Sequence, residues 1–313
     1  MKKKMFILII LLSLFYILSF PDITVHAAGS GLILWFEQVL PSLLPFAILS
    51  NIIIASDILP SLSKKLLPYL QKLIPVSSSG SFVLLSGFLF GFPMGSKNCA
   101  KLLLDDKMEK SEAEVLFIIT NNMSPVFIQS YILGQQLQLP EYFGWSILLL
   151  YLPPFLLGRQ LLKKNYHMQN NHKKSASRSK INFQIIDAGI MNGFETLTKI
   201  GGYIMIFSIL ASCFLLTPIS DLAKTICIGA IELTNGIHFL STTSLPIESK
   251  YVLAMSFTAF GGLSGIAQTS AMIKGTNLSI KKYIFWKLIL CIITGILTFL
   301  LIQAVPINSA CQM

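Results

Sequence analysis

A lysine inside apolar sequence is the first candidate for chemistry in this chain. It ends the string Gly91-Phe-Pro-Met-Gly-Ser-Lys97. The glycines and the proline of this string break a helix and leave backbone N–H groups unpaired, and helix starts of this kind attract anions. We therefore predict that Gly91, Gly95, Lys97 and Asn98 bind an anionic solute. The alternative is a hydrated lysine at the cytoplasmic mouth of a hairpin.

A polar break is the second candidate, and it lies within the apolar run Val115 to Leu133. Asn121 and Asn122 place two amides there, and Pro125 removes a backbone donor just after Ser124. Lipid exposure of these groups would be unfavourable. The side chains of Asn121, Asn122 and Ser124 therefore either bind a solute in a cavity or pack between helices.

An isolated acid is the third candidate. Glu232 lies in apolar sequence, and Asn235 and His238 follow it within two turns. An intramembrane carboxylate is a functional-site hypothesis by default. Glu232 could take up a coupling proton, pair with Lys97 or bind a substrate donor, whereas the alternative is a helix-end acid in water.

A second glycine-rich segment resembles the first. The pattern SxxxFGxxxG begins at Ser86 and recurs at Ser256, and the second copy contains Gly261 and Gly265 and is followed by Gln268. We predict a second hairpin over 256–273 that presents these three residues to the solute. Close helix packing at small residues is the alternative, and it accounts less well for the glutamine.

Enzyme chemistry has little support in this sequence. There is no GxSxG elbow, no CxxC and no zincin spacing, so we expect no enzymatic activity, no metal and no cofactor. The isolated residues concerned are His26, His167, His172, His238, Cys99, Cys213, Cys227, Cys291 and Cys311.

These candidates must be positioned by helices in a bilayer. Of 313 residues, 53% are hydrophobic and 12% are charged, which is too little polar surface for a soluble fold. The net charge of +10 lies in short loops beside apolar spans, where membrane orientation explains it better than nucleic-acid binding does. Long uncharged runs lie at 5–20, 38–56, 73–96, 115–140, 142–158, 200–220, 251–273 and from 288 onward.

The distribution of lysines predicts a topology with a cytoplasmic N-terminus. Residues 1–30 are read as an anchor helix and an external loop at Asp22 to Ser30; Val25-His26-Ala27 leaves cleavage of this segment open. Because both flanks of 73–104 are basic, we expect a re-entrant hairpin with its tip at 91–95. Residues 185–199 are read as an interfacial helix before the span 200–220. The units are therefore 31–162 and 185–313, two related halves joined by a basic cytoplasmic linker at 163–184.

These motifs resemble the YlbJ-type sporulation integral membrane proteins of the nucleoside-recognition or Gate domain group. The resemblance covers Trp35-Phe-Glu-Gln-Val-Leu-Pro-Ser-Leu-Leu-Pro-Phe46, the 91–97 string, the break at 121–125, Glu232-Leu-Thr-Asn-Gly236, and Gly262 to Gln268. It implies an all-α polytopic membrane protein with two related halves, each with a re-entrant helical hairpin and broken helices.

The resemblance also implies a function. It points to transport of a small anion, with dipicolinate as the leading substrate, in the bacterial cell membrane or the outer forespore membrane during sporulation. A nucleoside-type transporter and a non-transporting scaffold remain alternatives, as does a homo-oligomer. A nucleoside site would rely on Asn, Gln and Glu side chains more than on a lysine.

Overall fold

The computed structural model describes residues 2–56, 69–165 and 183–307. Within these ranges the chain forms helices and connecting turns and contains no β-strand. Four helices are long and apolar enough to cross a membrane, at Pro21–Ala55, Pro140–Lys164, Phe183–Leu216 and Ile280–Ala304. The predicted all-α polytopic membrane fold is therefore confirmed.

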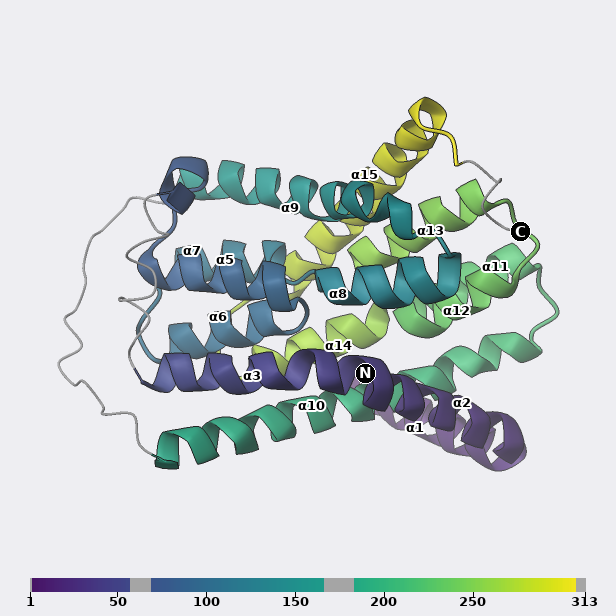
Figure 1. Cartoon of the computed structure of the whole chain (residues 1–313). Coiled ribbons are helices and arrows are strands. Elements are labelled where there is room, and N and C mark those ends of the chain that lie inside the picture. Colours follow the sequence, from purple (N-terminus) through teal and green to yellow (C-terminus); the bar gives the residue numbers. More distant parts are fainter. Residues whose placement is uncertain (1, 57–68, 166–182, 308–313) are drawn as a thin grey trace.

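The first half contains a long helix, a hairpin, a broken helix and a second long helix (Figure 1). Its elements are α1 (Lys2–Ser19), α2 (Pro21–Leu34), η1 (Trp35–Val39), α3 (Leu40–Ala55), α5 (Ser78–Phe90), α6 (Met94–Leu104), α7 (Lys110–Ile119), α8 (Pro125–Phe127), η2 (Ile128–Leu137), η3 (Pro140–Tyr142) and α9 (Phe143–Asn165).

The second half has the order of element types that the first half has from α2 onward. Its elements are α10 (Phe183–Ser212), η4 (Cys213–Leu216), α11 (Asp221–Ile231), α12 (Leu233–Thr242), α13 (Ile247–Phe260), α14 (Gly262–Met272) and α15 (Ile280–Ala304). Most of the expected basic linker at 163–184 lies outside the described residues.

The α5–α6 hairpin has its turn where the sequence predicted it. Helix α5 begins at an N-cap, Ser77, whose side chain accepts a hydrogen bond from the Gly80 N–H. It ends at Gly91, whose φ of 75° and ψ of −165° are open to glycine alone. After Phe92 and Pro93 the chain reverses into α6, which packs against α5. The hairpin is confirmed, and its depth in the membrane stays a prediction.

The predicted break after α7 is also present. Residues Thr120 to Ser124 are not helical, and Pro125 begins the next helix at a position where its missing N–H costs nothing. The Ser124 hydroxyl caps that helix by accepting from the Phe127 N–H. Helices α8 and η2 then continue the direction of α7 (Figure 1).

The second hairpin lies at Glu232 and not at 256–273, which corrects the prediction. Helices α11 and α12 pack against each other and meet at Glu232, whose extended backbone ends one helix and starts the next. The close approach needs Gly229 and Gly236, because a Cβ on Gly236 would collide with the Cα of Gly229. This turn contains no proline and no glycine at its centre, which is why the sequence pattern missed it.

Residues 256–273 instead form a broken helix. Gly261, with φ 82° and ψ 3°, interrupts the chain between α13 and α14, and the two pieces run in the same direction (Figure 1). The two SxxxFGxxxG segments therefore lie on different kinds of element, one on a hairpin and one on a broken helix. Each half still has one hairpin and one broken helix, as predicted, while a repeat relation between the halves stays a prediction.

Two further segments, predicted as an external loop and as an interfacial helix, are parts of long helices in the structure. The expected external loop at Asp22 to Ser30 is helical, and the helix runs without interruption from Pro21 to Ala55. The expected interfacial helix at 185–199 is the first half of α10, which packs along α3. Gly189 and Gly193 permit this contact, because a Cβ on either would press on Ile52 or Ile48.

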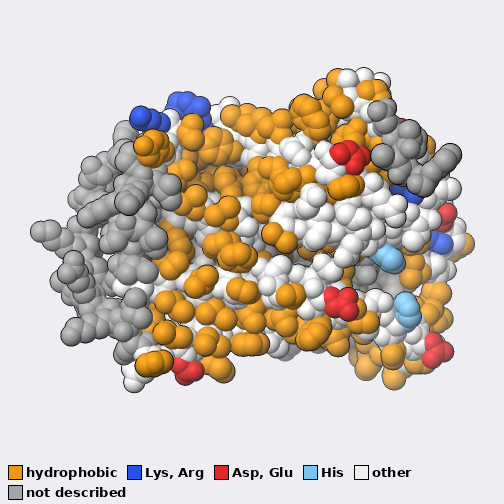
Figure 2. Space-filling model, in the orientation of Figure 1, with side chains coloured by type: hydrophobic (Ala, Val, Ile, Leu, Met, Phe, Trp, Pro, Cys, Tyr) orange, Lys and Arg blue, Asp and Glu red, His pale blue; other side chains and the backbone are white. Residues whose placement is uncertain are grey.

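The outer surface between the ends of these helices is largely apolar (Figure 2). On α15, for example, Phe285, Ile292 and Phe299 are all more than half exposed. Such a surface suits hydrocarbon and would be unfavourable in water.

The α11–α12 hairpin should be sensitive to one methyl group. We expect Gly236→Ala to destabilise the protein by roughly 1–3 kcal/mol, because the added Cβ meets backbone that cannot move aside. Thermal unfolding of the purified protein measures the effect. Gly202→Ala is the matched control, since nothing lies within 4 Å of the added Cβ at that helical position; equal unfolding temperatures for both variants would contradict the tight hairpin.

Candidate functional site

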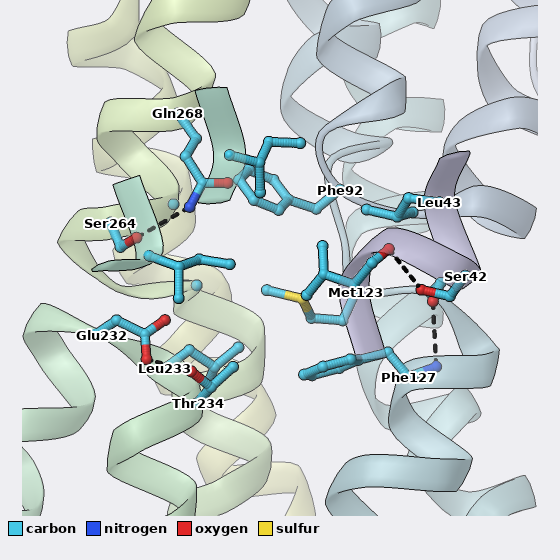
Figure 3. A pocket seen from close by; sticks show the side chains of 16 residues that line it. Ser42, Leu43, Phe92, Met123, Phe127, Glu232, Leu233, Thr234, Ser264 and Gln268 are labelled. Carbon is cyan, nitrogen blue, oxygen red and sulfur yellow. Dashed lines mark hydrogen bonds between the residues drawn. The ribbon is translucent and has the colours of Figure 1, made fainter. Parts of the chain in front are cut away.

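A central cavity lies where the two hairpins and the two broken helices meet (Figure 3). Its volume is about 60 Å³, which is room for about two water molecules. Helices η1, α3 and α10 complete its wall. The lining residues are Val39, Ser42, Leu43, Phe92, Met123, Ser124, Phe127, Ile200, Ile204, Glu232, Leu233, Thr234, Gly261, Ser264, Gly265 and Gln268.

The cavity faces the beginnings of helices and not their ends. Ser124 precedes α8, Glu232 precedes α12 and Gly261 precedes α14, whereas none of the lining residues lies on α5, α7, α11 or α13. A helix N-terminus carries a partial positive charge and unpaired N–H groups. Three such termini converge on this space, so its backbone favours negative charge.

Glu232 is the one ionisable side chain in the lining, and it is 3% exposed. One carboxylate oxygen accepts from the Thr234 hydroxyl and, at 2.8 Å, from the Asn235 backbone N–H. Figure 3 shows the other oxygen turned toward the interior of the cavity. Glu232 therefore caps α12 and keeps one oxygen for a donor in the cavity.

Gln268 presents a second acceptor. Its Nε2 donates to the Ser264 hydroxyl at 3.0 Å, while its Oε1 is buried and has no protein partner. Figure 3 places the Gln268 side chain beside the ring of Phe92 from the first hairpin tip. A buried acceptor without a donor is unfavourable, so a solute N–H or O–H would stabilise it.

Lys97 does not reach the cavity. Its ammonium donates to the Thr196 hydroxyl at 2.7 Å and, less closely, to the Asn192 carbonyl at 3.5 Å. These contacts tie α6 to α10. Among the described residues no ion pair joins Lys97 to Glu232, so the structure does not bring together the two charges that the sequence suggested as a pair.

Asn98 also lies outside the cavity lining. Its Nδ2 donates to the Ser86 hydroxyl at 3.0 Å and to the Ser50 hydroxyl at 3.4 Å. The side chain therefore links the two helices of the first hairpin to α3. Gly95 is likewise a packing position, where an added Cβ would press on Thr120.

The two asparagines of the α7 break act between helices. The Asn121 side chain donates to Thr269 at 2.8 Å and to the Tyr283 hydroxyl at 2.7 Å, and accepts from Ser96 at 3.1 Å. Asn122 is buried beside it. Of the predicted break residues, Ser124 lines the cavity, while the two amides follow the alternative of interhelical polar packing.

Sequence reasoning missed Lys287, which is 2% exposed on α15. Its ammonium donates to Asn122 Oδ1 at 3.2 Å. Its position in the chain could have indicated burial, because it lies seven residues inside a helix that begins at Ile280. The last long uncharged run begins at 288, directly after this lysine, so the sequence pattern did not predict a buried cation.

A larger hollow of about 700 Å³ lies next to the cavity, between α2, η1, η2, α10, α11 and α12. Asn235 lines it and donates to the Ser208 hydroxyl at 2.7 Å. Histidine and acidic side chains interrupt the apolar surface near this part of the molecule (Figure 2), and the hollow itself is lined by Asp22, His26, Glu37 and His238.

A hydrogen bond joins a residue of one lining to a residue of the other. Tyr131 lines the hollow, Thr234 lines the cavity, and the Tyr131 hydroxyl donates to the Thr234 carbonyl at 3.0 Å.

Comparison with known proteins identifies a relative that is an integral membrane protein. The chain is 25% identical over 91% of its length to the sporulation integral membrane protein YlbJ of Bacillus subtilis (strain 168), and the match covers 79% of that protein. The predicted resemblance is confirmed. No family model matches the chain, and no solved structure matches it significantly. The chain is thus similar to a YlbJ-type membrane protein along nearly its whole length.

Proposed function

We propose that this protein transports a small anionic solute across the membrane and that the central cavity is its binding site. The observation that carries the proposal is the convergence of three helix N-termini, those of α8, α12 and α14, on one cavity. Transporters built from discontinuous helices use such termini to hold anionic groups near the bilayer midplane. A scaffold protein would have no need of this arrangement.

The cavity is small in this structure. About 60 Å³ is too small for an aromatic dicarboxylate, while the neighbouring hollow has about 700 Å³. The turns of the two hairpins, at Phe92 and Glu232, both contribute to the wall. Movement of either hairpin would open the site, which is the geometry that alternating access requires.

Dipicolinate is the leading substrate by resemblance to the sporulation protein, and the transporter would then act in a forespore membrane with its N-terminus in the cytoplasm. Its carboxylates suit the helix N-termini. The Lys97 ammonium, expected to bind a carboxylate, instead donates to Thr196 on α10. The acceptors Glu232 and Gln268 favour a solute that also donates a hydrogen bond, such as a partly protonated dicarboxylate.

A nucleoside-type solute is the second candidate. It is favoured by the same two side chains, since Glu232 and Gln268 would accept from hydroxyl or ring N–H groups and no lysine lines the cavity. The two candidates differ in charge, so competition between dipicolinate and uridine separates them.

Uptake into proteoliposomes tests the proposal. We expect labelled dipicolinate to enter vesicles that contain the protein faster than protein-free vesicles, with weaker competition by uridine. Gln268→Leu should lower the apparent affinity by about tenfold, because one hydrogen bond to the solute is lost.

Gln303→Leu is the matched control, since Gln303 is exposed near the end of α15. Faster uptake of uridine than of dipicolinate would reassign the substrate, and failure of both solutes to enter would contradict a transporter of either class. Normal core dipicolinate in spores of a deletion strain would exclude dipicolinate as the physiological solute.

A further inference from the structure

A buried lysine without an acidic partner lies beside the α7 break. The Lys287 side chain is 2% exposed, and its ammonium lies 3.2 Å from Asn122 Oδ1 and 5.9 Å from the centre of the Tyr283 ring. The ion pairs of the described residues involve other lysines. A cation in this position is costly unless the site uses its charge.

Asn122 connects this charge to the end of a helix. Its Nδ2 donates to the carbonyl of Ile119, the last residue of α7, at 2.7 Å. Its own backbone carbonyl accepts from the Phe92 N–H at 2.6 Å. Lys287, the α7 terminus and the first hairpin tip are therefore held together through a single residue, and Phe92 is part of the cavity wall.

The end of α7 is a position that favours positive charge. The C-terminus of a helix carries a partial negative charge, and discontinuous-helix transporters use such half-helix ends and unwound carbonyls to coordinate their coupling cations. We infer that Lys287 is a built-in cation that takes the place of a coupling ion at this break. The α7 end and the hairpin tip are then held without any inorganic cation.

This inference rests on the proposed transport function, but its test requires no solute. Purified full-length protein is unfolded thermally in sodium chloride, ammonium chloride or tetramethylammonium chloride at equal ionic strength. Wild type should unfold at the same temperature in all three salts. In Lys287→Ala the vacated space admits a small cation, so unfolding in sodium or ammonium chloride should occur about 2–4 °C above that in tetramethylammonium chloride.

Two variants serve as controls. Lys282→Ala removes an exposed lysine of the same helix that pairs with Glu114, and Lys287→Arg keeps the buried charge; both should unfold independently of the cation. The inference is overturned if Lys287→Ala unfolds at one temperature in all three salts, or if wild type itself is stabilised by sodium. Should Lys287→Ala fail to fold, Lys287→Ser is read in the same way.

Discussion

Replacing Glu232 by alanine is expected to reduce solute uptake by more than about tenfold. The substitution removes the acceptor for the Asn235 N–H and the Thr234 hydroxyl, so α12 loses its cap at the turn that forms the cavity wall. It also removes the oxygen that faces the cavity. Uptake into proteoliposomes measures the loss, and thermal unfolding should show a cost of about 1–2 kcal/mol from the cap alone.

Glu232→Gln separates the two roles. A glutamine side-chain oxygen can still cap α12, so stability should be close to wild type, while a group that can gain or lose a proton is removed from the cavity. Uptake should therefore persist with a changed pH dependence. Glu141→Ala is the control for the loss of an acid, since Glu141 is exposed. Wild-type uptake by Glu232→Ala would show that the site lies elsewhere.

The sequence predicted those parts of the fold in which a few neighbouring residues determine the backbone conformation. The turn at 91–93 contains glycine and proline between apolar runs whose flanks are both basic, and the α7 break contains Pro125 after three polar residues. In each case the backbone has few alternatives. Local chemistry was therefore enough to place a hairpin and a broken helix in the first half.

The hairpin of the second half was predicted at the wrong place because the residues that determine its turn lie on its two helices and not at the turn itself. The turn at Glu232 depends on Gly229 and Gly236, which lie on opposite helices of the hairpin and matter only once those helices pack. The SxxxFGxxxG pattern at 256–265 matches the sequence of the first hairpin, but in the folded protein it forms the broken helix α13–α14. A sequence motif of this kind does not distinguish the turn of a helical hairpin from a break between two helices that run in the same direction.

The roles of the charged residues also depended on packing. Lys97 follows the hairpin tip, yet one helical turn carries its ammonium to Thr196 on α10. Lys287 directly precedes the uncharged run that begins at 288, yet the helix begins at Ile280 and the lysine side chain is buried. Of these three charged residues, Glu232 alone lines the cavity, and its role in binding stays a prediction.

The largest expected effect on folding is at Gly91. Its φ of 75° with ψ of −165° excludes residues with a side chain, and an added Cβ would also collide with the backbone of Ser124, lying 2.7 Å from its Cα. We expect Gly91→Ala to destabilise the protein by roughly 2–6 kcal/mol, the sum of backbone strain and overpacking. Thermal unfolding and recovery of monodisperse protein in detergent measure it.

Gly261→Ala isolates one of these two contributions. Gly261 has a positive φ of 82° but lies in the left-handed region with ψ 3°, and nothing lies within 4 Å of an added Cβ. The variant should therefore lose only about 1–2 kcal/mol from backbone strain. The difference between the two variants reports the contact between the first hairpin tip and the α7 break together with the greater backbone strain at Gly91. Equal losses would mean that Gly91 and Ser124 are not in contact, and the cavity wall would then have to be drawn without the hairpin tip.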